Sequence, residues 1–192
     1  MPWEASAEDF IPRELCTTWR EMAQIAGVQY HAELMLSSLE PVLPVEHDRR
    51  DFAVLEGELD LATRRALTSA LVGASANTTA FYWYSLTAAI NGKDPVVLSA
   101  GVADAEQVLT YARQHDLAVT NNPEYIWLVD RSWVVMTDWD LTSTYVACDA
   151  ALADSLLADP GLEAVEVRPT TRVDDYADTL NRDAGSPGGA PT

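Results

Sequence analysis

A run of apolar, β-branched and aromatic residues predicts β-structure in the second half of the chain. Residues 125–140 are rich in β-branched and aromatic side chains, and the turn-forming residues 130–132 interrupt them. This pattern is typical of a β-hairpin. A third strand is predicted near residues 143–147.

The second strand of this hairpin is apolar on both faces near its middle. Trp133, Val135 and Thr137 share one face, and Val134 and Met136 share the other. Such a strand is expected to be central and covered on both sides. We therefore expect Trp133 to be a core residue. The same interpretation, as core or sheet-face residues, is given to Trp83, Trp127, Tyr82, Tyr84, Tyr125 and Tyr145. Trp139 is not assigned to the core or to a binding surface.

Apolar residues spaced by three and four predict several helices, together with their ends. Asp60 and Asp149 are suitable N-caps, while Gly27 is suited to end a helix. The predicted helices cover residues 12–27, 29–39, 61–72, 103–115 and 149–157.

Other segments are assigned from local composition. Residues 52–58 and 80–88 are predicted strands, and Asn91-Gly92 indicates a tight hairpin before residues 95–98. A helix over residues 78–90 is the alternative. Residues 162–167 alternate as a final strand, and residues 172–182 indicate a short helix.

These elements predict an α+β fold with a mixed, mainly antiparallel sheet, helices packed on it and an N-terminal helical segment. The helical segment covers residues 1–50 and ends in a linker that contains Pro41 and Pro44. The α+β core domain covers residues 51–168, and a C-terminal tail covers residues 169–192. Residues 183–192 are rich in Gly, Pro and Ala and are expected to be disordered.

The net charge of the chain limits the classes of partner that it can bind. Thirty acidic and twelve basic residues give a net charge of −18, and Lys93 is the only lysine. This charge repels nucleic acids and anionic membranes, whereas it attracts a basic protein. An equally weighted alternative is that the acidity only keeps the protein soluble.

Neither secretion nor a disulfide framework is indicated. Cys16 and Cys148 are the only cysteines and lie in apolar surroundings typical of reduced thiols. The first residues are acidic and unlike a signal peptide, and no apolar run is long enough to span a bilayer. We expect a cytoplasmic protein.

The candidate chemistry favours recognition over catalysis. Asp138 and Asp140 would lie roughly 7 Å apart on one side of a strand and could hold a divalent cation, but solvated carboxylates explain them better. His31, His47 and His115 lie in no catalytic motif. No catalytic residue, metal or cofactor is therefore predicted. The predicted partner-binding residues are Asp130, Asp138, Trp139 and Asp140, an acidic rim with one aromatic anchor.

Two resemblances bear on function. The motif at residues 130–141, the strand after it and the run over residues 151–167 resemble small acidic bacterial proteins of uncharacterised function, across about residues 120–168. In size, acidity and tryptophan use, the chain is similar to immunity proteins that neutralise toxins. This second resemblance implies an immunity-type or antitoxin-like inhibitor of a basic effector. The alternatives are a small enzyme or ligand-binding protein with a pocket near Asp138 and Asp140, and a structural or assembly subunit.

Overall fold

The computed structural model describes the chain as two compact units. The first, called the sheet unit, contains residues 56–75, 78–118 and 122–162. The second, called the end unit, combines residues 17–39 with residues 163–174 and 176–181. These ranges are the residues that the structure describes. The predicted linker, most of the predicted strand over residues 52–58 and the predicted disordered tail lie outside them.

The sheet unit is built on five antiparallel strands in the order β2-β1-β3-β4-β5. The strands are β1 (Thr79–Tyr84), β2 (Val96–Gly101), β3 (Tyr125–Leu128), β4 (Val134–Thr137) and β5 (Thr144–Ala147). Together with the helices below, this sheet confirms the predicted α+β class with a mainly antiparallel sheet.

The hairpin of β3 and β4 and the third strand, β5, are confirmed. Between β3 and β4, Arg131 adopts a positive φ of 59°, and the Asp130 Oδ1 atom accepts a hydrogen bond from the Ser132 amide at 3.0 Å. An Asp side chain that binds the backbone two residues later stabilises a turn. The local sequence is therefore sufficient to place this turn.

Four α-helices belong to the sheet unit within the described ranges. Both predicted N-caps are confirmed, since Asp60 accepts from the amides of Ala62 and Thr63, and Asp149 accepts from the amide of Leu152. The helices are α3 (Leu61–Ser75), α4 (Leu86–Ile90), α5 (Ala105–Gln114), which follows a 3-10 turn at Val102–Asp104, and α6 (Ala150–Ala158).

The prediction for residues 80–88 is correct only in its first half. The strand ends at Tyr84, and α4 takes the place of the predicted hairpin, so Asn91 and Gly92 end a helix. The Glu124 carboxylate accepts hydrogen bonds from the amides of Ser85 and Thr87, at 2.9 and 3.0 Å. Because Glu124 is far away in sequence, local composition could not predict this helix start.

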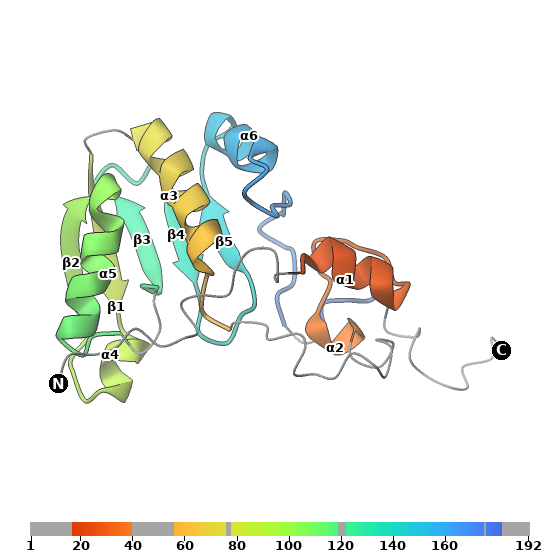
Figure 1. The fold of residues 1–192 in the computed structure, drawn as a ribbon, viewed down its shortest axis with the longest axis horizontal. Coiled ribbons are helices and arrows are strands. Elements are labelled where there is room, and N and C mark those ends of the chain that lie inside the picture. The colour runs from red at the N-terminus through yellow and green to blue at the C-terminus, as the bar shows by residue number, and fades with distance from the viewer. Residues whose placement is uncertain (1–16, 40–55, 76–77, 119–121, 175, 182–192) are drawn as a thin grey trace. The chain divides into compact units, whose positions relative to one another are not determined.

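The helices bury one face of the sheet. In Figure 1, α3 and α5 lie in front of the strands. Trp133 is only 2% exposed, and its Nε1 atom donates a hydrogen bond to the Ser75 Oγ atom at 2.6 Å, which confirms it as a core residue. The core also contains Leu67, Leu71, Tyr82, Tyr84, Val108, Leu128, Val135, Leu152 and Leu156.

The end unit is smaller, and the helix prediction there was partly wrong. Its helices are α1 (Trp19–Ala26) and α2 (Leu36–Leu39), so residues 29–35 are not helical. Helix α1 begins after Thr18, which forms a reciprocal capping box with Glu21, and the predicted start at Pro12 lies outside the described residues. Gly27 ends α1 with a φ of 68°, as predicted. The main apolar cluster of the described residues here contains Met22, Ala23, Leu34 and Leu39.

The predicted strand over residues 162–167 and the predicted helix over residues 172–182 are wrong for the residues that the structure describes. Instead, the Glu163 carboxylate accepts from the amides of Trp19 and Arg20, at 2.7 and 2.8 Å. These two amides belong to the first turn of α1, where amides have no partner within the helix. Polar contact with α1, not strand pairing, fixes this segment.

A second polar cluster connects the two chain segments of the end unit, residues 17–39 and residues 176–181. Asp178 is 2% exposed, and its Oδ1 atom lies 3.0 Å from the His31 Nε2 atom. In the tautomer with its proton on Nε2, the His31 ring donates to Asp178 while its Nδ1 atom accepts from the Glu33 amide. Asn181 holds the backbone of Gln29 through two hydrogen bonds, both at 2.9 Å.

Candidate partner-binding surface

The second face of the sheet, called the open face, is only partly covered. Register and alternation place eight large side chains on it, and each of them is half-buried or exposed. The prediction that β4 is covered on both sides is therefore wrong. The eight residues are Phe81, Trp83, Val97, Tyr125, Trp127, Val134, Met136 and Tyr145.

Aromatic side chains from β1 and β3 pair across the middle of the open face. The rings of Trp83 and Tyr125 stack with their centroids 5.5 Å apart, and those of Phe81 and Trp127 lie 5.6 Å apart in a tilted arrangement. Neighbouring aromatic residues on paired strands stabilise a sheet. They also form a rigid, amphipathic surface that contacts a partner at a small cost in side-chain entropy.

Beside these rings the surface is hollowed. An open hollow of about 310 Å³ is lined by Trp83, Tyr125, Trp127, Arg131 and Val134. This volume is at the lower limit of pockets that bind small molecules. Because the hollow is open and apolar, it is also suited to receive one side chain of a protein partner.

Asp130 lies at one border of the open face, in the exposed turn between β3 and β4. Hydrogen bonds from the backbone and side chain of Ser132 lower the pKa of Asp130. The carboxylate is therefore charged at neutral pH. Arg131, which lines the hollow, is its neighbour in the same turn.

Asp138, Trp139 and Asp140 lie at the other end of β4. The two aspartates are exposed and Trp139 is half-buried. The strand ends at Thr137, and the Asp138 Oδ1 atom accepts a hydrogen bond from the Asp140 amide at 3.0 Å. The two carboxylates thus belong to a turn, and the predicted arrangement on one side of a strand is wrong.

A glycine holds this second turn in place. Gly57 has a φ of +67°, donates a backbone hydrogen bond to Leu141 at 2.8 Å, and lies against the backbone of Trp139. A Cβ atom on Gly57 would come within 2.9 Å of the Trp139 Cα atom. No signal in the sequence connects Gly57 with residues 138–141.

The four predicted residues therefore do not form a single rim. Asp130 and the turn of Asp138–Asp140 are separated by the four residues of β4, which span roughly 13 Å. Val134 and Met136 of the open face lie between them. The structure thus gives two acidic turns with an aromatic surface between the two.

Sequence reasoning missed this surface itself. Along β1, Tyr82 and Tyr84 are buried in the core, whereas Phe81 and Trp83 alternate with them on the open face. The alternation was visible in the sequence, but aromatic residues occupy both faces. Only the position of the helices decides which face stays open.

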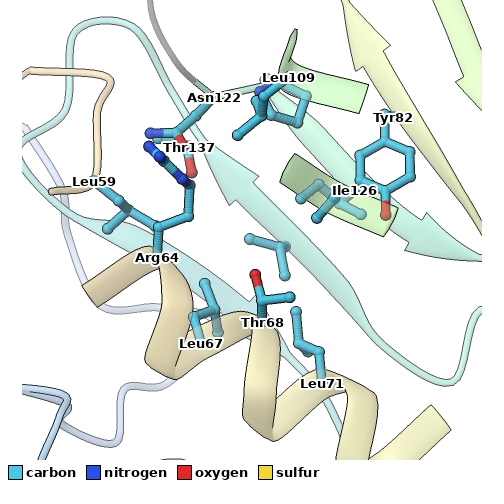
Figure 2. Close-up of a pocket in the computed structure, with 13 residues that line it drawn as sticks. Leu59, Arg64, Leu67, Thr68, Leu71, Tyr82, Leu109, Asn122, Ile126 and Thr137 are labelled. Carbon is cyan, nitrogen blue, oxygen red and sulfur yellow. The ribbon is translucent and has the colours of Figure 1, made fainter. Parts of the chain in front are cut away.

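The sheet unit also contains a small, partly open cavity between α3, α5 and the sheet. Figure 2 shows Thr68 and Leu71 of α3 pointing toward the strand residue Ile126, and Arg64 of α3 pointing toward Asn122. The cavity has a volume of about 30 Å³, which accommodates about one water molecule. It does not include Asp138 or Asp140, so it gives no support to the alternative of a substrate pocket beside them.

Two of the polar residues at this cavity, Arg64 and Tyr82, interact with other parts of the protein. Arg64 forms an ion pair with Glu106, with 3.1 Å between its Nε atom and Oε1. The Tyr82 hydroxyl donates to the Gly101 carbonyl, and burial together with the nearby Asp104 charge raises its pKa to about 12. This hydroxyl therefore stays protonated at neutral pH and is no candidate for a catalytic base.

Among the described residues, no three His, Cys, Asp or Glu side chains gather closely enough to hold a metal ion. Within the same ranges, no helix combines the length and apolar character needed to cross a bilayer.

Comparisons of the chain with protein-family models, with curated proteins and with solved structures found no match.

Proposed function

We propose that this chain is a protein-binding module that acts in the cytoplasm as an immunity-type or antitoxin-like inhibitor of a basic effector protein. The observation that carries the proposal is the open face, an aromatic surface between two acidic turns. Trp and Tyr residues dominate the energetics of protein interfaces, while flanking charges accelerate association with a partner of opposite charge.

Each part of the surface has a separate role in this mechanism. The net charge of −18 attracts a basic partner from a distance, and Asp130, Asp138 and Asp140 pair with its Arg and Lys side chains. Trp127 and Tyr125 then exclude water from the contact, and the hollow beside them receives one partner side chain. Inhibition follows because the bound module covers the basic surface of the effector.

The test begins with the full chain as bait and with identification of a copurified basic protein by mass spectrometry. The purified pair is then measured by surface plasmon resonance. Replacing Trp127 with Ala should weaken affinity by roughly thirtyfold, as expected for a hot spot of about 2 kcal/mol. Tyr111→Ala is the control, because Tyr111 is an exposed aromatic residue on α5, away from the open face.

The acidic turns are tested separately with Asp138→Asn/Asp140→Asn. Removing two charges should slow association and reduce its dependence on salt, because steering is screened over about 8–10 Å at ordinary ionic strength. Asp94→Asn/Asp154→Asn removes the same charge elsewhere and is the matched control. An equal effect of the two double variants, or full affinity of Trp127→Ala, would refute this binding surface.

Calorimetry with Mg²⁺ and Mn²⁺ distinguishes binding of a protein from metal chemistry. Under the proposal, neither ion gives saturable binding to the parent chain, and neither raises its melting temperature. Saturable binding that disappears in Asp138→Asn/Asp140→Asn would instead favour the enzyme alternative.

A further inference from the structure

The two edges of the sheet differ in how well they are protected. Among the described residues, β2 pairs only with β1, and β5 pairs only with β4. An edge strand exposes unpaired amides and carbonyls, and proteins commonly protect it by shortness, charge, proline or a bulge. Strand β5 has only four residues, whereas β2 has six. The ladder between β2 and β1 runs without a bulge from Val96 to Gly101.

Strand β2 also lacks the other protective features. No charged residue occurs between Asp94 and Asp104, and the single proline of this stretch, Pro95, precedes the strand. In a chain with 30 acidic and 12 basic residues, these nine uncharged positions leave the edge without electrostatic protection. Within the part of the chain that the structure describes, the outer edge of β2 is therefore available for pairing with another strand.

The side chains of β2 leave apolar area on both faces of this edge. Val97 lies on the open face and is 50% exposed. Val96, Leu98 and Ala100 point to the core and are only partly buried against it. A strand placed alongside β2 would cover both groups while it satisfies the backbone, so apolar burial and hydrogen bonding favour the same contact.

We infer that β2 pairs antiparallel with β2 of a second copy of this chain, which gives one continuous sheet across a two-fold axis. Around such an axis, residue i of one copy lies opposite residue j of the other and residue j opposite residue i, so a charge near the middle of the strand would lie close to its own copy. An uncharged strand avoids this repulsion. The pairing of the two strands also joins the core of one copy to the core of the other, and the open face of one copy to the open face of the other.

Salt gives this inference a signature that differs from that of the proposed function. Two chains with a charge of −18 repel each other, and salt screens this repulsion. Self-association through β2 should therefore strengthen as salt concentration rises. Binding of a basic partner to the open face should weaken over the same range, so one inference can fail while the other stands.

The test is sedimentation of the full chain over a range of concentrations, at low and at high salt. A concentration-dependent dimer is expected, and Val97→Lys should weaken it roughly tenfold or more, because a lysine protects an edge strand. Val129→Lys is the matched control. It adds the same charge at a valine that is 62% exposed and lies just after β3, outside β2.

Hydrogen exchange of the unmodified chain gives a second measurement that requires no variant. The β2 amides that face outward should become protected as chain concentration rises, while those of β5 should not change. A monomer at every concentration would overturn the inference. So would a dimer that Val97→Lys leaves intact, one that Val129→Lys weakens equally, or concentration-dependent protection away from β2.

Discussion

The two units of this protein are stabilised by different kinds of contact. The sheet unit has an extended apolar core, with Trp133, Tyr82 and Leu71 among its buried residues. The end unit buries only four apolar residues in its main cluster and depends on polar side chains that bind distant backbone amides. Apolar burial scales with area, whereas each polar contact depends on one geometry.

This difference predicts which single substitutions should lower the stability of each unit most. In the sheet unit, a large core side chain has many neighbours, and its loss leaves a cavity. In the end unit, one carboxylate can satisfy several amides, so its loss leaves buried donors without partners. The following predictions test that contrast, from the largest expected effect to the smallest.

Replacing Trp133 with Ala should lower the free energy of unfolding by about 3–5 kcal/mol, since a large buried side chain is removed. Trp133→Phe should cost less, because it keeps most of the packing and loses only the hydrogen bond to Ser75. Urea denaturation measures both variants. A loss below roughly 1 kcal/mol for Trp133→Ala would show that apolar packing does not dominate the sheet unit.

Gly57→Ala tests the backbone contact that holds the turn at residues 138–141. The positive φ and the close approach to Trp139 should together cost roughly 3 kcal/mol. Gly92→Ala is the matched control, because Gly92 has a φ of +70° but has no atom near its Cβ position. Its cost should be about 1 kcal/mol. Thermal unfolding of both variants checks the difference, and equal losses would exclude a role for the contact with Trp139.

Asp178→Asn tests the polar cluster of the end unit. Burial by itself raises the pKa of Asp178, but hydrogen bonds from Asn181, Ser38 and His31 outweigh it and lower the pKa from 3.8 to about 2. The folded carboxyl therefore binds its proton more weakly than the unfolded one. It contributes about 2 kcal/mol of stability above pH 4, and this contribution disappears as the pH falls towards 2.

The measurement is the stability of Asp178→Asn and of the parent chain as a function of pH. Their difference should be full at neutral pH and should shrink between about pH 4 and 2. Asp154→Asn, at an exposed position of α6, should change stability by less than about 0.5 kcal/mol. A difference that does not depend on pH would contradict the assignment to the charge of Asp178.

Glu163→Gln should have the smallest effect, about 1 kcal/mol, because it removes a negative charge from the N-terminus of α1 while keeping an acceptor oxygen. Hydrogen exchange of the amides of Trp19 and Arg20 should accelerate. Glu166→Gln, an exposed neighbour, is the control. Unchanged exchange at both amides would show that Glu163 does not fix the start of α1.

Much of the sheet unit followed from local patterns in the sequence. The hairpin of β3 and β4, strand β5, the caps Asp60 and Asp149, and the burial of Trp133 each depend on residues close together along the chain. The same reasoning located the acidic residues Asp130, Asp138 and Asp140, although it placed them on one rim.

The elements that could be predicted from the sequence are therefore those with local signals. These signals are alternation, helical spacing, caps and turn residues. The tertiary structure decided the rest. It placed α4 through Glu124, placed residues 163–174 and 176–181 through single polar contacts with residues between Trp19 and Glu33, and left one aromatic face of the sheet open. The physical reason is that a polar contact between distant residues leaves no periodic pattern, and an apolar strand does not reveal which of its faces the helices will cover.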